Sequence, residues 1–254
     1  MLRYKNNALS TVIFRVDFVK FINIENESLN KKCLSKYPIV QNENVVEQSI
    51  STVINEKGEM TVERNENNKK YVNRRYSNRQ MTRRVTLSPK CMIIELQDYI
   101  SYVDTKAAFM EIFTAVSEAN SDVAIARIGM RYINQIDLSN IARSTRAKYI
   151  KASLLSSPYE DVLDDSSLAR TQHLTEIAVD DFRVRCVTGY FNPDYPAPIK
   201  RYVVTLDYDA FIQGNADASE VSGYLDKFHD AIQMLFENSI LQKQKESMVV
   251  VDAE

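Results

Sequence analysis

A strand pattern that occurs twice most constrains the fold of this chain. The run that begins at Ile13 and the run that begins at Ile125 both alternate apolar and polar residues. With a single one-residue gap they align Arg15 with Arg127 and continue into the same Ile-Asn pair. Such an echo predicts a fold built from two related halves, although apolar strands also resemble each other by chance.

The ends of the two halves also resemble each other. Ile93–Leu96 precedes Asp98-Tyr99, and Val203–Leu206 precedes Asp207-Tyr208. A helix pattern with apolar residues at i, i+3, i+4 and i+7 follows each of these strand patterns. We therefore predict one pseudo-duplicated domain over residues 1–241, with halves at about 8–120 and 121–241, and a C-terminal tail at 242–254.

The helix patterns determine the predicted fold class. Asp104 is placed to cap a helix over 105–120, and 220–240 reads as a second long helix. A helix laid across an antiparallel sheet buries its apolar stripe on one sheet face. The predicted class is α+β, a mostly antiparallel sheet covered by two long helices, with a helix-grip or TBP-like outline. A third helix is predicted over 139–155 and a hairpin over 45–64, with its turn at 56–58.

Composition limits the classes of function. Apolar residues make up 44% and charged residues 26%, with a net charge of -2, which is typical of a soluble globular protein. No apolar run reaches the roughly 18 residues that cross a bilayer, and residues 1–7 lack a signal-peptide pattern. Cys33, Cys91 and Cys186 are far apart, so we expect free thiols in a reducing cytoplasm. We therefore predict no membrane partner. No cofactor is predicted either, because no phosphate-binding glycine motif is present.

A basic segment lies between residues 64 and 84. Clustered cations bind phosphates, and an aromatic ring among them can stack on a base. A solvated hairpin surface and a surface for a partner protein are the alternatives. The predicted nucleic-acid-binding residues are Lys69, Lys70, Tyr71, Arg74, Arg75, Tyr76, Arg79, Arg83 and Arg84.

Two arginines and two aspartates form a second candidate group. Arg127 and Arg131 lie on one face of the predicted central strand, as do Asp207 and Asp209 on a later strand, because residues two or four apart share a face. Neighbouring strands would pair them as structural ion pairs or as the polar wall of a ligand groove. The Asp-Tyr-Asp run could also bind a divalent metal, but we favour the ion pairs and predict no metal site.

No catalytic residue is predicted. His173 and His229 are the only histidines, and neither has the cysteine or serine nucleophile pattern of a catalytic triad beside it. His229 lies on the flank of an amphipathic helix and is expected to pack there. The apolar run Met248–Val251 near the C-terminus predicts an added edge strand, within this chain or on a partner, or a disordered tail.

The order of these patterns resembles a sporadically distributed, uncharacterised prokaryotic family of about this length. The most specific part of the resemblance is the run Arg127-Ile128-Gly129-Met130-Arg131-Tyr132-Ile133-Asn134. Residues 8–14, the run Leu206–Asp209 and the Phe228–Phe236 helix complete it. The chain departs from the family pattern at residues 5–8, where a proline is usual. The resemblance implies a cytoplasmic accessory protein of genetic conflict, such as phage defence or a toxin–antitoxin pair, and it carries no activity with it.

The sequence thus favours a non-enzymatic binding or regulatory protein that acts through a protein partner or as a homo-oligomer. The first alternative is a nucleic-acid-binding protein that uses the basic segment. The second is a metal- or phosphate-dependent enzyme around Asp207 and Asp209.

Overall fold

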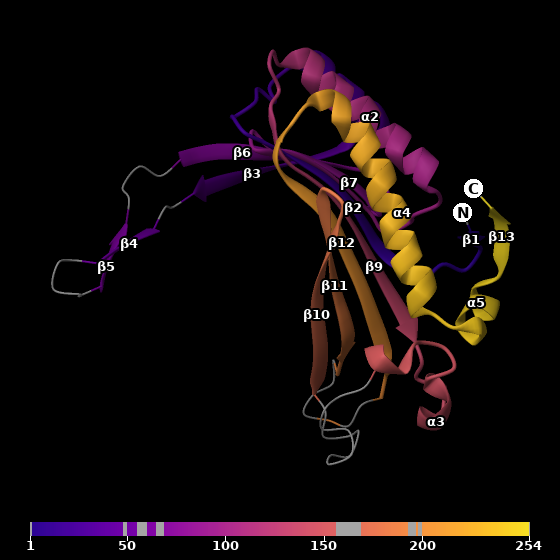
Figure 1. Ribbon diagram of the computed structural model, residues 1–254. Helices are drawn as coiled ribbons and strands as arrows, with labels where there is room; N and C mark the ends of the chain where they lie inside the picture. The colour runs from indigo at the N-terminus through magenta and orange to yellow at the C-terminus, as the bar shows by residue number, and fades with distance from the viewer. Residues whose placement is uncertain are drawn as a thin grey trace.

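Nine strands form one antiparallel sheet in the computed structural model, which describes residues 2–47, 50–54, 60–64, 69–155, 169–192, 197 and 200–253. Figure 1 shows the sheet with its helices on one face. The strands lie in the order β10 (Arg170–Val179), β11 (Phe182–Phe191), β12 (Val203–Ala216), β9 (Ile125–Asp137), β2 (Leu9–Phe18), β8 (Cys91–Leu96), β7 (Arg83–Leu87), β6 (Lys69–Ser77) and β3 (Ile39–Glu47).

The central pair β2–β9 follows from the alternation in the sequence. Val12, Phe14 and Val16 are fully buried on the helix-covered face, and the residues between them point to the other face. Strands from residues 9–96 lie on one side of this pair and strands from residues 125–216 on the other. The β2–β9 contact is therefore where the two predicted halves meet, and their common origin stays a prediction.

Two helices pack on the buried face. Helix α2 (Tyr102–Ala119) starts at Ser101, whose hydroxyl accepts the Asp104 amide at 3.1 Å, so Ser101 and not Asp104 is the N-cap. Helix α4 (Val221–Ser239) packs against β9 and β12. Phe109 of α2 meets Phe14 at 5.7 Å between ring centroids, and Phe228 of α4 meets Phe182 at 5.0 Å. A third helix, α1 (Glu27–Lys36), packs on α2.

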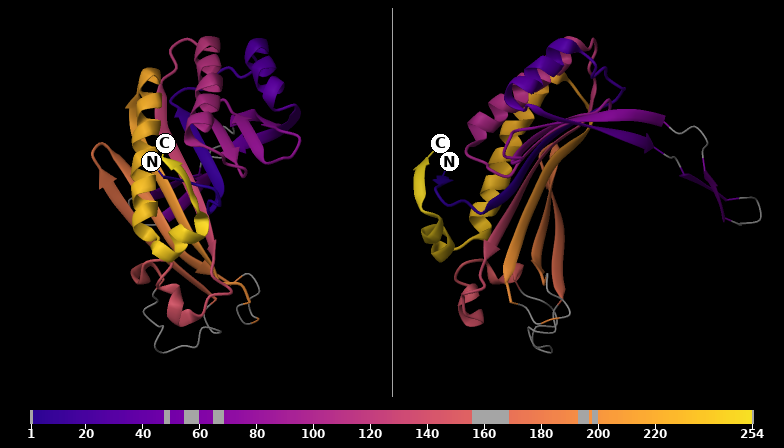
Figure 2. Two further views of the ribbon diagram at one scale, coloured as in Figure 1. Left: turned by 90° about the vertical axis from the view of Figure 1, so that its right-hand side faces the viewer. Right: turned by 180° about the vertical axis from the view of Figure 1, so that it is seen from behind.

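The predicted fold class is wrong in its balance of sheet and helix. The sheet dominates, and no pair of long helices covers it: α2 and α4 have only 18 and 19 residues. Their apolar stripes bury the middle of the sheet, whereas the edge strands β3 and β10 have no fully buried residue. Figure 2 shows strands extending well beyond both helices. The helix-grip or TBP-like outline is dropped for the same reason.

The predicted helix over 139–155 is also absent. The structure has one turn of helix, α3 (Arg143–Arg146), and a 3-10 turn, η1 (Ala152–Leu154). Ile150 is fully buried and forms a β-bridge with Ile240 after α4. This tertiary pairing holds an extended backbone where local propensity favours a helix.

An arm extends from one edge of the sheet (Figures 1 and 2). Strand β7 pairs only with Arg74–Ser77 of β6, so residues 43–47 of β3 and 69–73 of β6 form a two-stranded ribbon. The hairpin β4 (Ile50–Ile54) with β5 (Met60–Arg64) lies beyond the ribbon and forms its own two-stranded sheet. The hairpin predicted over 45–64 is thus split between two sheets, and its predicted turn at 56–58 lies outside the described residues.

The two ends of the described chain pair with each other. Strand β1 (Leu2–Tyr4) runs antiparallel to β13 (Val250–Ala253), which follows helix α5 (Gln242–Met248). The apolar run near the C-terminus thus adds a strand within this chain, and Met248 is buried against the core. In the described part of the chain, no helix combines the length and the hydropathy that a bilayer crossing requires.

Candidate functional site

Carboxylates neutralise much of the predicted basic segment. Arg75 lies 2.8 Å from Glu43 and Arg83 lies 2.8 Å from Asp98. Arg74 contacts Glu25 in the same way, and Arg84 lies 3.8 Å from Glu95. The arginines of β6 and β7 are thus paired with carboxylates of the same chain. Such neutralised cations contribute less to phosphate binding than the sequence predicts.

The remaining predicted residues of the basic segment divide between the arm and the core. Tyr76 is buried, and its hydroxyl donates to Asn30, so its ring is closed to a stacking base. Arg79 is exposed at the turn between β6 and β7, and Lys70 is exposed on the arm. Lys69 and Tyr71 lie on the ribbon of the arm, where both contact Phe21.

A groove at the base of the arm gathers further cations around an aromatic ring. Phe21 is 48% exposed and packs edge-on against Tyr71, with 5.6 Å between ring centroids. The ammonium groups of Lys69 and Lys90 lie 5.4 and 5.6 Å from the Phe21 centroid. Phe21, Lys69 and Lys90, together with Arg15, Asp17 and Lys20, line a groove of about 550 Å³, the arm groove. Of the predicted residues, only Lys69 lines it.

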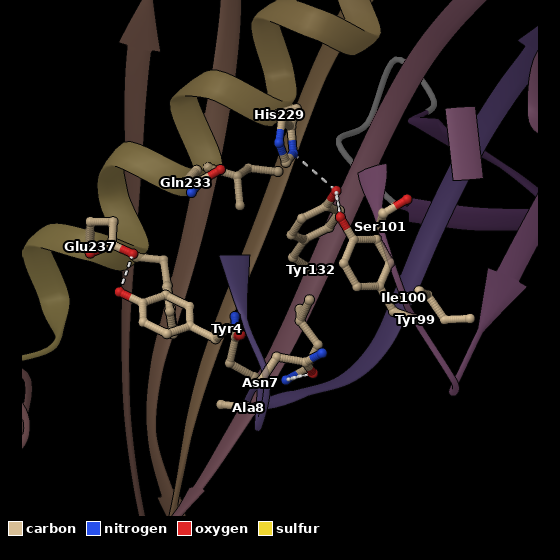
Figure 3. A pocket seen from close by; sticks show the side chains of 14 residues that line it. Tyr4, Asn7, Ala8, Tyr99, Ile100, Ser101, Tyr132, His229, Gln233 and Glu237 are labelled. Atoms are coloured by element: carbon tan, nitrogen blue, oxygen red, sulfur yellow. Dashed lines mark hydrogen bonds between the residues drawn. The ribbon is translucent and has the colours of Figure 1, made fainter. Parts of the chain in front are cut away.

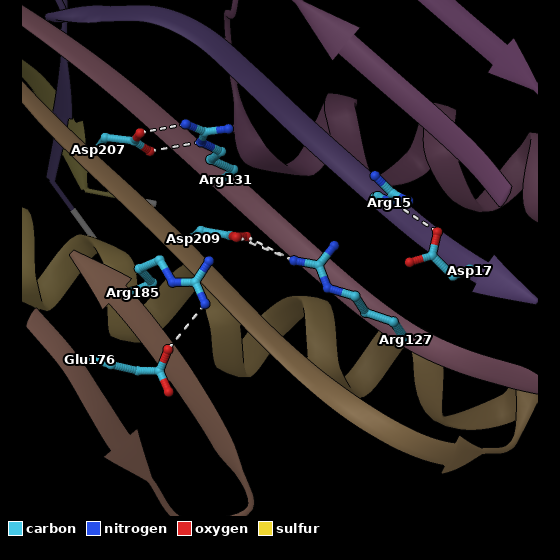
Figure 4. A network of polar contacts seen from close by, with 8 residues as sticks. All are labelled: Arg15, Asp17, Arg127, Arg131, Glu176, Arg185, Asp207 and Asp209. Carbon is cyan, nitrogen blue, oxygen red and sulfur yellow. Dashed lines mark hydrogen bonds and ion pairs between the residues drawn. The ribbon is translucent and has the colours of Figure 1, made fainter. Parts of the chain in front are cut away.

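The arginines and aspartates of the second candidate group meet on the open face of the sheet (Figure 4). Arg131 binds Asp207 through two hydrogen bonds of 2.8 and 2.6 Å, and Arg127 lies 3.2 Å from Asp209. This happens because β9 and β12 are neighbours in the sheet. Both aspartates thus present their oxygens to arginine side chains, which favours the structural ion pairs over a metal site.

The charges continue across the sheet as a ladder. Glu176, Arg185, Asp209 and Arg131 are successive cross-strand partners on β10, β11, β12 and β9. Opposite charges that face each other across strands stabilise a sheet. The hydrogen bond with Asp207 raises the pKa of Arg131, and burial raises the pKa of Asp209. The open face is therefore a self-neutralising surface, which needs no helix to cover it.

A pocket that the sequence analysis missed lies between α4, β9 and the N-terminal segment (Figure 3). His229, Gln233 and Glu237 of α4 line one wall. The Tyr132 hydroxyl lies 3.1 Å from His229 Nδ1 and 3.4 Å from the Tyr99 hydroxyl. The sequence contains a signal for this wall, because polar residues four apart lie on one side of a helix, next to its apolar stripe.

Burial controls the charge of the pocket histidine. His229 is buried, its ring stacks on Tyr102 at 3.9 Å, and burial lowers its pKa to about 4. The imidazole is therefore neutral near pH 7. Glu237 is held by the Tyr4 hydroxyl at 2.7 Å and by Lys245 at 2.8 Å.

The described residues contain no candidate metal site, because no three histidine, cysteine or acidic side chains among them lie close enough together to hold an ion. The three cysteines are free, and burial raises the pKa of the Cys33 thiol to about 12. A thiol with a raised pKa is a poor nucleophile at neutral pH.

No model of a known protein family matches the sequence, and no curated protein matches it either.

Proposed function

We propose that this protein is a non-enzymatic binding protein that acts through a protein partner, which it contacts with the arm. The arm supports the proposal because it extends away from the rest of the molecule and exposes apolar residues of its own. Val46 is 50% exposed and Met60 is 69% exposed. An isolated two-stranded ribbon is marginally stable in water, and exposed apolar strand residues commonly pair with or pack on another chain. The occupant is a second protein or a second copy of this chain.

The cellular setting belongs to the same proposal. A cytoplasmic accessory module, such as phage defence or a toxin–antitoxin pair, agrees with three free cysteines and no candidate membrane helix in the described residues. The resemblance of the run Arg127–Asn134 to a sporadic prokaryotic family supports the module.

Nucleic-acid binding is the second candidate, and the arm groove is the observation that favours it. Phe21 offers a partly exposed ring with Lys69 and Lys90 beside it, of which Lys90 is paired with Glu47, and Lys20 lines the same groove. Stacking on an aromatic ring beside cations is the way proteins bind single strands without sequence preference. The paired arginines of β6 and β7 count against a larger nucleic-acid surface. Metal- or phosphate-dependent catalysis at Asp207 and Asp209 is less favoured, because arginines already occupy both carboxylates.

Shortening the arm tests the proposal. Glu47 and Lys69 are directly paired, so replacing residues 48–68 by Asn-Gly closes β3 and β6 with a two-residue hairpin turn. We expect the full chain, purified from its own host, to retain a stoichiometric partner or to form a defined oligomer. The shortened chain should lose it, with its melting temperature within about 3 °C of the full chain.

Point variants at the two sheet edges provide a matched control. Val46→Asp on β3 should release the partner, whereas Leu174→Asp on the opposite edge strand β10 should keep it; both residues are exposed and apolar. Retention of the partner by the shortened chain would overturn the proposal, and so would a full chain that stays a lone monomer. Flat titrations of the full chain with single-stranded DNA and RNA at low salt would remove the second candidate.

A further inference from the structure

The two ends of the described chain form a small unit beside α4 (Figures 1 and 2). Strands β1 and β13 pair with each other in a two-stranded sheet, separate from the nine-stranded one. The amides of Lys5 and Asn6 extend this pairing, because they donate to the backbone carbonyls that directly precede β13. We call residues 2–6 and 249–253 the terminal clasp. An isolated pair of strands is marginally stable in water, so the clasp depends on its contacts with the rest of the molecule.

The terminal clasp closes one side of the pocket beneath α4. Tyr4 of the clasp lines this pocket, and so do Asn7 and Ala8 directly after it. Figure 3 shows the Tyr4 hydroxyl pointing to Glu237 at one end of the hollow. Ile232 of α4 also lines the pocket and is only 1% exposed. Release of the clasp therefore removes part of the pocket wall and opens the hollow to solvent.

The clasp is fastened to the body by a hydrogen bond and by a buried side chain next to it. Tyr4 donates its hydroxyl to Glu237 at 2.7 Å, and Met248 is buried just before β13. Val250 and Val251 of β13 are about half exposed, so they bury little apolar surface. The Tyr4 hydroxyl is thus a contact that can be removed without changing the apolar core.

Val249 holds the closed clasp in a strained conformation. Its φ is 56°, in the left-handed region, where a β-branched residue is an outlier. The backbone takes this angle at the point where the chain turns from the end of α5 into β13. Once β13 leaves β1, Val249 is free to return to an extended conformation. The closed clasp therefore carries strain that its opening relieves.

We propose that the terminal clasp is a lid on the pocket beneath α4. The lid opens in the folded protein when β13 separates from β1 and Tyr4 releases Glu237, and the strain at Val249 sets how often it opens. The proposal concerns access to the pocket, and it does not depend on the arm or on any partner bound there.

Cysteine labelling of the full chain tests the lid. In Ile232→Cys, a thiol reagent reaches position 232 while the lid is open, and mass spectrometry separates this cysteine from the three native ones. Cys33 of α1 is fully buried in another part of the core and reports global unfolding. Position 232 should be labelled about tenfold or more faster than Cys33, because local opening costs less than global unfolding. It should be labelled more slowly than the same chain unfolded in urea.

Two valines of the clasp provide a matched pair of variants. Glycine tolerates positive φ, so Val249→Gly should slow labelling at position 232 and hydrogen exchange of the Lys5 amide by one common factor of about three or more. Val251 is exposed to the same degree and does not have a positive φ. Val251→Gly should therefore leave both rates unchanged or raise them.

Tyr4→Phe tests the lid from the other strand. It keeps the ring and removes the hydrogen bond to Glu237, so both rates should rise by a factor of about three or more. This variant decides the matter if Val249→Gly does not fold. Exchange of the Lys5 amide in chains that keep Ile232 decides it if Ile232→Cys does not fold.

Labelling of position 232 at the rate of Cys33 would overturn the proposal, because the pocket would then open only on global unfolding. Labelling as fast as in the unfolded chain would overturn it as well, because nothing would then cover the pocket. The role of Val249 is refuted if Val249→Gly and Val251→Gly change the rates alike. The lid itself is refuted if Tyr4→Phe changes neither labelling nor exchange.

Discussion

His229 shows how one residue can connect the core and a candidate site. Its imidazole is enclosed by Tyr102 and Tyr132, and Asp226 on the same helix is the nearby acid that favours its charged form. Burial outweighs this attraction and lowers its pKa from 6.5 to about 4. The folded protein thus keeps the ring neutral under conditions in which an unfolded chain would protonate it.

The stability of the protein should depend on pH through this residue. Because the folded-state pKa lies below the unfolded value, the contribution of His229 is complete above about pH 6.5 and is lost as the pH falls toward 4. Between pH 7 and pH 4.5, the wild-type free energy of unfolding should fall by about 2 kcal/mol more than that of His229→Gln, as measured by urea denaturation.

The control for the pH effect is the other histidine. His173→Gln changes a residue on the edge strand β10 and should keep the wild-type pH dependence. An equal pH dependence in the wild type and in His229→Gln would show that His229 does not titrate on unfolding as described.

At the scale of strands, the β9–β12 pair depends on a close approach at Gly129. The Arg127 guanidinium lies across this glycine on its way to Asp209 and the Phe211 ring, whose centroid is 5.1 Å from Arg127 Cζ. A Cβ at position 129 would lie 3.1 Å from Arg127 Cζ. A side chain here requires the guanidinium to shift by a few tenths of an ångström, which disturbs its contacts with Asp209 and Phe211.

Gly129→Ala should therefore destabilise the protein by about 1 kcal/mol in urea unfolding. Gly223→Ala is the matched change, because a Cβ at Gly223 in α4 meets nothing within 4 Å. Alanine is the better helix former, so this variant should gain about 0.5 to 1 kcal/mol. Equal stability of Gly129→Ala and the wild type would contradict the role given to the arginine.

The same elements show what the sequence can predict. Alternating burial imposes a period of two, so the positions of β2, β9 and the β10–β11 pair follow from the sequence. Which strands are neighbours does not: Arg131 and Asp207 meet although 76 positions separate them. Their pairing could be anticipated only as one of several possibilities.

The extent of the sheet that the helices leave uncovered, and the pocket, could not be predicted from the sequence for physical reasons. Four-residue apolar stripes locate α2 and α4 but do not show how much of a nine-stranded sheet they cover. The region around Ile150 looks helical until its bridge to Ile240 is known. The pocket draws on four separate segments, and only the spacing of His229, Gln233 and Glu237 marks it in the sequence.

At the scale of the whole molecule, the two faces of the sheet are stabilised in different ways. One face packs on α2 and α4 and forms the core, and the other is stabilised by its ladder of opposite charges. Among the described residues, no further strand pairs with the outer edges at β3 and at β10. Open edges invite pairing with other chains, and β3 differs from β10 in continuing into the arm. The proposed partner contact therefore lies on the arm, which continues from the β3 edge.

The pairing of β1 with β13 has a consequence for the rate of folding. Leu2 pairs with Ala253, so nearly the whole chain must be looped to form this contact, whereas the β10–β11 hairpin closes locally. Closing a longer loop costs more entropy, and long-range pairing is slow. In a pulsed hydrogen-exchange refolding experiment, the amides of Lys5 and Asn6, which bond to Val249 and Met248, should become protected after those of the hairpin. Simultaneous protection would rule out this order. Later protection of Lys5 and Asn6 would show that β1, the first strand in the sequence, becomes ordered after the hairpin.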